Sequence, residues 1–165
     1  MTDPMTDPMT DPMTDPMTDP MTDLMTAPTT GSLFQDVQQF YARQMRLLDQ
    51  GAVEEWADTF TEDGVFDQNV AEPLTGRVDI AVASRKRVDQ LVAEGITRRH
   101  WLGMLEVDPQ DEQGVVRTRY YAFSMATERG GRPRITASTY AEDTLVRHEG
   151  TWLVRYRRVI HDGTD

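Results

Sequence analysis

Two residues that can exchange a proton near neutral pH lie far apart in the chain, Asp49 and His100. Asp49 stands where an apolar helical pattern ends, a position at which the helix dipole disfavours a carboxylate. His100 lies in an expected strand and shares a face with Leu102 and Met104. A histidine beside a carboxylate is a common acid–base pair. The alternative is structural, with Asp49 solvated near a turn and His100 hydrogen-bonded in the core.

Further polar side chains are candidates for the wall of a pocket. Alternation gives Tyr120 and Ser124 one face of a strand, and it gives Ser138 and Tyr140 one face of the next. A buried tyrosine hydroxyl can donate a hydrogen bond to a carbonyl or enolate oxygen. The alternative for Tyr120 and Tyr140 is a row of tyrosines along the surface of the sheet.

The last expected strand carries Arg155, Arg157 and Arg158, so at least one of them faces the side opposite to the others. We expect Arg158 to contact a substrate, and the alternative is a surface charge. His148 and His161, expected in a turn and in the C-terminal segment, receive no role.

The chain lacks the residues or motifs that several kinds of chemistry require. The chain has no cysteine, which excludes thiolate nucleophiles, disulfides and zinc sites built on sulfur. Its three histidines are scattered, so we expect no metal site. Neither Gly-x-Gly-x-x-Gly nor Gly-x-Ser-x-Gly occurs. The remaining expectation is chemistry without a cofactor.

Periodicity predicts the elements that must position these residues. Apolar residues at three- and four-residue steps predict a first helix that starts after Ser32 as its N-cap and ends before Gly51. Two further helices are expected over 53–60 and 76–95, with a turn over 61–64 and a short strand over 65–67. Alternation then predicts long strands over 97–107, 115–127, 135–147 and 151–160.

Helices that precede long strands indicate an α+β fold. The helices would pack on one face of an antiparallel sheet, and strands of this length must coil strongly. We therefore expect a cone-shaped α+β barrel with an internal pocket, formed by residues 31–165 as a single domain.

Residues 1–30 differ in composition from the rest of the chain. They repeat Met-Thr-Asp-Pro and contain no basic residue, which predicts a disordered low-complexity tail. The alternatives are a docking or solubilising arm and a tandem expansion around a start at Met21 or Met25. The net charge of −11 offers no basic field for nucleic acid or anionic lipid. No apolar run or secretory signal is present, so we expect a cytoplasmic protein without membrane contact.

A set of short motifs resembles the nuclear-transport-factor-two-like superfamily, and most closely its SnoaL-like branch of polyketide cyclases and dehydratases, with scytalone dehydratase and bile-acid dehydratase as relatives. The resemblance runs from Phe34 to Val159. The motifs are Tyr41-Ala42-Arg43, Leu48-Asp49, Trp56-Ala57-Asp58-Thr59-Phe60, Asp63-Gly64-Val65-Phe66-Asp67, Gly76-Arg77, Arg99-His100 and Gly150-Thr151-Trp152-Leu153-Val154.

The resemblance implies that Asp49 and His100 are the catalytic acid–base pair, with Asp49 pointing into the cone. It also implies substrate contacts at Tyr41 and Trp56. The chain departs from scytalone dehydratase where that enzyme has a second pocket histidine, since the stretch here reads Phe123-Ser124-Met125. Two tyrosines of that enzyme fall on Leu48 and Gln68, and its pocket asparagine falls near Ala141.

The expected function is that of a dehydratase, cyclase or isomerase without metal or nucleotide. It would act by enolate chemistry on a small hydrophobic aromatic or polyketide intermediate, in pathways such as antibiotic biosynthesis. One alternative is an accessory subunit similar to the small subunit of ring-hydroxylating dioxygenases, and another is a protein that only binds a metabolite. In each case we expect a homodimer through the face of the sheet, with Trp101, Phe123 and Trp152 as exposed aromatic residues.

Overall fold

A computed structural model describes residues 30–164, so the tail predicted over residues 1–30 lies outside the described residues except for Thr30. The described elements are α1 (Thr30–Asp49), α2 (Val53–Ala57), β1 (Phe60–Gln68), β2 (Ala71–Thr75), α3 (Arg77–Ala93), β3 (Ile96–Val107), β4 (Val116–Glu128), β5 (Arg134–His148) and β6 (Thr151–His161).

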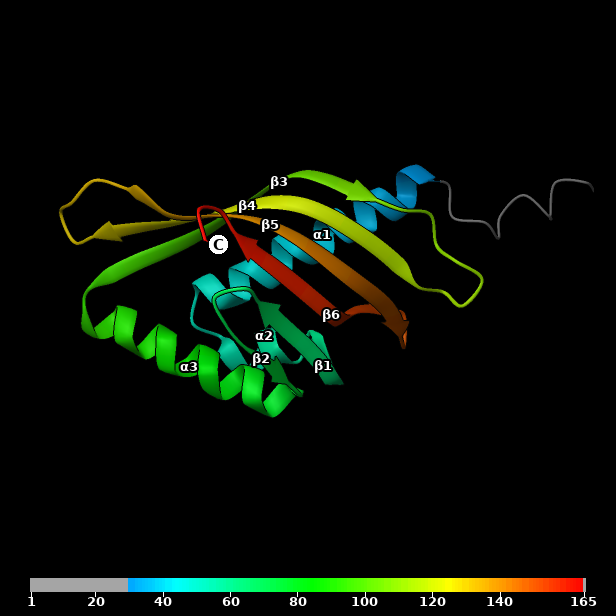
Figure 1. Ribbon diagram of the computed structural model, residues 1–165, viewed down its shortest axis with the longest axis horizontal. Coiled ribbons are helices and arrows are strands. Elements are labelled where there is room, and N and C mark those ends of the chain that lie inside the picture. Colours follow the sequence, from blue (N-terminus) through cyan, green and yellow to red (C-terminus); the bar gives the residue numbers. More distant parts are fainter. Residues whose placement is uncertain (1–29, 165) are drawn as a thin grey trace, which may run out of the picture.

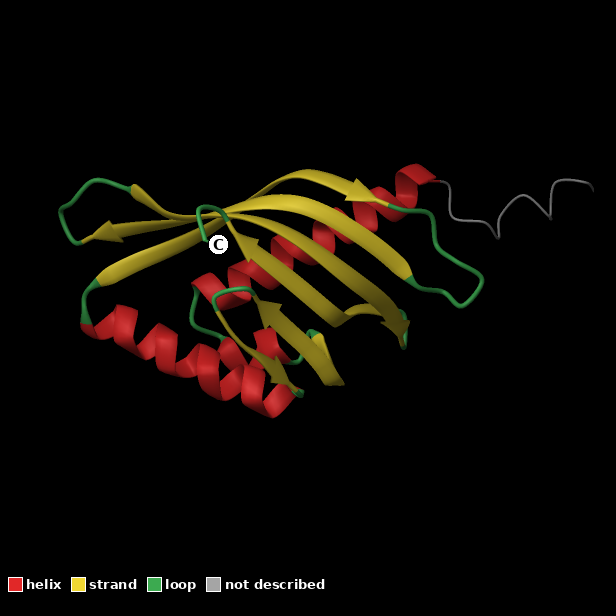
Figure 2. Cartoon of the chain, viewed as in Figure 1, coloured by secondary structure: helices red, strands yellow, loops and turns green. Residues whose placement is uncertain are grey.

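The strands form one sheet in the order β2-β1-β6-β5-β4-β3. The sheet curves around α1, which runs along its concave side, while α3 lies beside the β1–β2 end (Figure 1). Within residues 30–164 the edge strands β2 and β3 do not pair, so the sheet stays open. The expected α+β class with helices packed in a strongly curved sheet is confirmed, and Figure 2 shows helices and strands by colour.

One pair of strands departs from the expected antiparallel arrangement, because β1 runs parallel to β6. Parallel neighbours require a long crossover connection. All the chain between β1 and β6 supplies that connection here. The pairing places the first strand of the chain against the last strand.

The segment over 61–64, predicted as a turn, belongs to β1 instead. The register between β1 and β6 shifts between Phe60 and Val65, as in a β-bulge. A Cβ on Gly64 would approach the carbonyl oxygen of Thr61 to 3.0 Å, so this close approach requires glycine. Strand β2 was not expected, because its residues are exposed or partly exposed and show no apolar alternation.

Helix α1 begins at Thr30, so Ser32 lies inside the helix and is not its N-cap. The helix ends as predicted, since Gly51 takes a φ of +78° and its N–H donates to the carbonyl of Leu48 at 3.2 Å. Helix α2 ends at Ala57, before Phe60, which begins β1. None of the helices in the described part is long and apolar enough to cross a membrane.

The core lies between α1 and the concave face of the sheet. Trp56 of α2 packs edge-on against Phe60 at 5.1 Å and against Phe66 at 6.0 Å between ring centroids. The other fully buried apolar side chains include Val37, Ile80, Val116, Leu145 and Val154. This packing holds the C-terminal half of α1 against β3, where the candidate site lies.

Candidate functional site

The structure brings Asp49 and His100 into direct contact. Asp49 is the last residue of α1, and its Oδ1 lies 2.6 Å from Nδ1 of His100 on β3. The backbone N–H of His100 donates to Oδ2 of Asp49 at 3.0 Å. Their side chains are only 9% and 16% exposed. Two hydrogen bonds therefore hold the carboxylate and the imidazole in one orientation.

This geometry assigns different roles to the two ring nitrogens of His100. With Asp49 as acceptor, Nδ1 carries the proton and Nε2 keeps its lone pair. No hydrogen bond among residues 30–164 uses Nε2 of His100. The pair can therefore accept a proton at Nε2 while the Asp49 carboxylate stabilises the resulting imidazolium.

His100 lines a cavity on the concave side of the sheet. The cavity has an inner part of about 110 Å³ and an outer part of about 420 Å³. Both parts are lined by Leu48, Trp56, Phe66, Gln68, His100, Ser124, Ala137 and His161. Leu102, Ala122 and Val159 make the inner part largely apolar.

Of the predicted substrate contacts, Trp56, Tyr120 and Ser124 line this cavity. Ser124 lies directly across from His100 on the neighbouring strand β4. Asp49 does not line the cavity, although the resemblance implied that it points into the cone. It lies behind His100, in the wall of an open groove of about 900 Å³ between α1 and β3. Its carboxylate can therefore reach a ligand in the cavity only through His100.

The other predicted contacts lie elsewhere. The Tyr41 hydroxyl is buried, 2.8 Å from Oδ2 of Asp143. The Tyr140 hydroxyl donates to Glu142, and its ring lies 6.2 Å from the exposed ring of Tyr121, on the face of the sheet away from the cavity. Arg158 is exposed and lines none of the described parts of the cavity.

Arg157 occupies the inward position that was expected for Arg158. Its Nε and Nη2 donate to Asp143 at 2.9 and 2.6 Å, and Nη2 also donates to Gln44 at 2.7 Å. Burial alone would lower the pKa of Arg157, but the adjacent Asp143 carboxylate outweighs burial and the pKa lies above its usual value. Burial raises the pKa of Tyr41 and of Tyr120, which both face Asp143. We refer to Asp143, Arg157, Tyr41, Tyr120, Gln44 and Thr118 as the core network.

The residue that sequence reasoning missed is His161, which ends β6 and lines both parts of the cavity. Its Nε2 lies 3.3 Å from Oε1 of Gln68 on β1. The signal was available, because alternation along β6 puts Arg157, Val159 and His161 on one face. The prediction ended this strand at Ile160, one residue too early.

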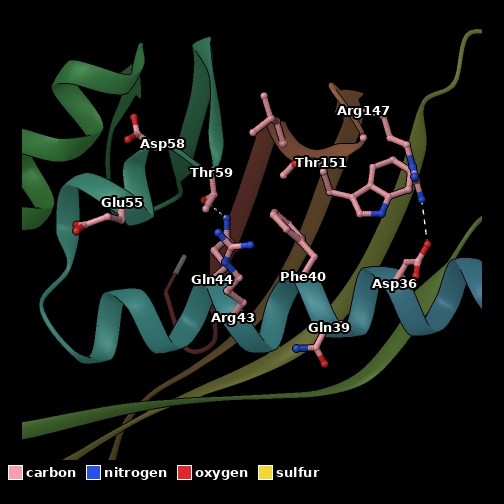
Figure 3. A pocket seen from close by; sticks show the side chains of 13 residues that line it. Asp36, Gln39, Phe40, Arg43, Gln44, Glu55, Asp58, Thr59, Arg147 and Thr151 are labelled. Carbon is pink, nitrogen blue, oxygen red and sulfur yellow. Dashed lines mark hydrogen bonds and ion pairs between the residues drawn. The ribbon is translucent and has the colours of Figure 1, made fainter.

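A separate pocket of about 390 Å³ lies beside the middle of α1 (Figure 3). Asp36 pairs there with Arg147 at 3.0 Å, and Gln44 donates to Thr59 at 2.6 Å. None of the predicted site residues lines it. Nowhere in residues 30–164 do three His, Asp or Glu side chains gather as they would around a metal ion.

Comparisons with known proteins assign the chain to one family. The SnoaL-like domain family matches residues 33–158. Aln2 from a Streptomyces species is 31% identical and has a TM-score of 0.76, over 82% of this chain and 95% of that protein. A protein from Catenulispora acidiphila in complex with S-DNPA is 36% identical and has a TM-score of 0.69, over 80% of this chain and 95% of that protein.

A third solved structure shares the fold alone. The beta subunit of a putative aromatic-ring-hydroxylating dioxygenase from Novosphingobium aromaticivorans is 20% identical, with a TM-score of 0.64 over 79% of this chain and 90% of that protein. A search of curated proteins finds no match. The family match spans most of the chain, and the fold and two relatives above 30% identity agree with it. The chain therefore belongs to the SnoaL-like domain family.

Proposed function

We propose that the protein is a cofactor-independent enzyme that dehydrates, cyclises or isomerises a hydrophobic polyketide-type intermediate by acid–base chemistry. One observation carries this proposal: the Asp49 carboxylate contacts His100, and His100 lines a largely apolar cavity. A similar protein in complex with the small molecule S-DNPA supports a small-molecule ligand.

In the proposed reaction, Nε2 of His100 removes a proton from a carbon next to a carbonyl group. The electron pair of the broken C–H bond moves to the carbonyl oxygen and forms an enolate, while Asp49 balances the charge of the imidazolium. The imidazolium then returns the proton. Transfer to a leaving hydroxyl releases water, and transfer to another carbon gives an isomer. In a cyclisation, the enolate carbon forms a bond to a second carbonyl carbon of the substrate, the electron pair of that C=O bond moves to its oxygen, and the imidazolium protonates this oxygen.

The cavity also offers a donor for the enolate oxygen. Ser124 lies across from His100 and lines both parts of the cavity. A donor aimed at developing negative charge in a site without water lowers the barrier. Tyr120 was also expected in this role, but its hydroxyl lies 3.5 Å from Asp143. We therefore assign the enolate oxygen to Ser124.

The test is turnover by the full chain on a panel of aromatic hydroxyketones, followed by mass spectrometry. We expect His100→Gln to lower the rate by about 10²-fold or more, because it removes the base. His148→Gln is the matched control, since His148 lies at the exposed end of β5. Full turnover by His100→Gln would overturn the mechanism.

Asp49→Asn tests the positioning role of the carboxylate. An amide no longer stabilises the imidazolium, so kcat should fall by about 10²-fold or more while KM stays nearly unchanged. A variant that raises KM and leaves kcat intact would contradict this assignment.

A homodimer is part of the proposal. The convex face of the sheet exposes Trp101 at 65%, Tyr121 at 57% and Phe123 at 40%, and contiguous exposed apolar side chains mark interaction surfaces. We expect light scattering to give a dimer mass for the full chain and a monomer mass for Trp101→Lys. Trp152, also expected on an exposed face, is buried.

The second candidate is an accessory subunit, favoured by the fold shared with the dioxygenase beta subunit and by the same apolar face. Ligand binding without turnover, unchanged in His100→Gln and Asp49→Asn, would favour it over the enzyme.

A further inference from the structure

The outer part of the cavity is lined by basic side chains and by no acidic side chain of the described residues. Arg87 of α3 and Arg98 of β3 line it together with His100 and His161. Among the described residues, no Asp or Glu side chain lines this part. The cavity is therefore basic at its entrance, in a chain whose net charge is −11.

These two arginines are among those of the described chain that form no ion pair, and both line the cavity. Neither lies within ion-pair distance of a carboxylate of residues 30–164. Ion pairs are formed by Arg77, Arg85, Arg119, Arg134, Arg147 and Arg157. Arg87 donates only to the neutral side chain of Gln90, at 2.9 Å.

Arg98 is partly buried, and its Nε has no hydrogen-bond partner in the described structure. Burial lowers the pKa of Arg98, the charge of Asp49 opposes this effect, and the like charge of Arg87 adds to it. Each oxygen of Asp49 contacts His100, and neither contacts Arg98 within hydrogen-bond distance. A partly buried guanidinium without acceptors is costly, and an anionic ligand that accepts hydrogen bonds from its terminal nitrogens would reduce that cost.

We infer that the outer part of the cavity binds the carboxylate of an organic acid through Arg98 and Arg87. The hydrophobic body of the acid then enters the inner part, between Leu102 and Val159, and passes His100. The inference rests on the proposed function, since this acid is the substrate class of the same site. It also gives the substrate a direction, with the carboxylate at the entrance and the reacting carbon beside Nε2 of His100.

Two probes that differ only in charge test this inference. 1-Naphthaleneacetate and its neutral amide, 1-naphthaleneacetamide, are titrated into the full chain by calorimetry at low and at high salt. We expect the acid to bind roughly tenfold or more tightly than the amide, because hydrogen bonds to charged groups are the stronger ones. The advantage should shrink at high salt. Equal binding of both probes, or binding of neither at millimolar concentration, overturns the inference.

Three variants locate the carboxylate. Arg98→Gln should weaken binding of the acid about tenfold and leave the amide unchanged. Arg87→Gln, at an exposed position that tolerates substitution, should weaken the acid several-fold in the same way. Arg99→Gln is the matched control, since it removes the same charge from the next residue of β3, which is exposed. An equal loss in Arg99→Gln would move the ligand to the groove between α1 and β3 and overturn the inference.

The probes do not react, so this test is independent of turnover. His100→Gln should keep the preference for the acid even though it loses the proposed activity. Loss of that preference in His100→Gln, with binding by Arg98→Gln intact, would contradict the assignment to Arg98.

Discussion

Two aspartates join α1 to the sheet, and their surroundings differ. Asp143 is fully buried, and its carboxylate accepts hydrogen bonds from Arg157 and Tyr41. Asp49 holds His100, whose second ring nitrogen has no partner in the described chain and whose side chain is partly exposed. A network whose members satisfy one another contributes stability and a unique packing. A pair with an unused nitrogen beside a cavity is available for chemistry.

The most severe test of this contrast is Asp143→Asn. It leaves the buried Arg157 guanidinium without its counter-charge, so the free energy of unfolding should fall by about 3–5 kcal/mol. Denaturant unfolding measures this change. The double variant Asp143→Leu with Arg157→Met should recover part of the loss, because it removes both charges. A loss below about 1 kcal/mol would mean that the core network behaves like a surface pair.

Tyr41→Phe tests a neutral member of the core network. The Tyr41 hydroxyl lies 2.6 Å from Thr118 and 2.8 Å from Asp143, so its removal leaves buried oxygens with fewer partners. We expect a loss of about 1–3 kcal/mol in the free energy of unfolding. Tyr140→Phe removes a hydroxyl on the convex face and should change stability by no more than about 0.5 kcal/mol. Equal effects of the two variants would contradict the contrast.

High pH should weaken the core network. The pKa values of Tyr41 and Tyr120 are raised by burial, so the folded protein holds their protons more tightly than the unfolded chain. Their contribution is therefore fully present below the unfolded pKa of about 10 and declines above it, by roughly 1 kcal/mol per pH unit for each tyrosine. Unfolding curves between pH 9 and about 11 measure the slope, which Tyr120→Phe should reduce. An unchanged slope would contradict the assignment.

Asp49→Asn tests the second aspartate of this comparison, which we expect to contribute little to stability. Its carboxylate accepts two hydrogen bonds from His100, of which an amide can keep one, so the loss in stability should be only about 0.5–1.5 kcal/mol. Turnover should nevertheless fall as proposed above. A loss of stability as large as that of Asp143→Asn, measured by the same unfolding curves, would make Asp49 a structural residue.

The smallest expected effect is that of Arg158→Gln. Arg158 is exposed and lies outside the cavity, so its substitution should change the free energy of unfolding by less than about 0.5 kcal/mol and leave ligand binding intact. Calorimetry with the acid probe checks the second part. A tenfold loss of binding would restore Arg158 as a substrate contact.

Periodicity in the sequence predicted the long helices and strands, including the helix that ends at Asp49 and the strand that carries His100. Alternation divides each strand into two faces, but it does not say which face is concave. Tyr120, Tyr140 and Arg158 were therefore all expected in the pocket, but only Tyr120 lines it, together with Arg157. The packing of α1 against one face of the sheet, where it contacts β3, β4, β5 and β6, decides which face is inside.

Pairings between distant segments were equally inaccessible. The parallel contact of β1 with β6 and the edge strand β2 depend on backbone hydrogen bonds, which leave no pattern in the side chains. His161 lies in the wall of the cavity because β6 extends beside β1. The sequence indicated only a C-terminal segment at this position, so it gave no sign of a site.

The pairing of β1 with β6 also has a consequence for the order of folding. Gln68 and His161 contact each other across 93 positions of the chain, whereas the hairpins of β3 to β6 close over short loops. Long-range pairings carry the larger entropy cost of loop closure and form more slowly than local ones. The hairpins should therefore assemble first, and the cavity should become complete only when the first strand joins the last.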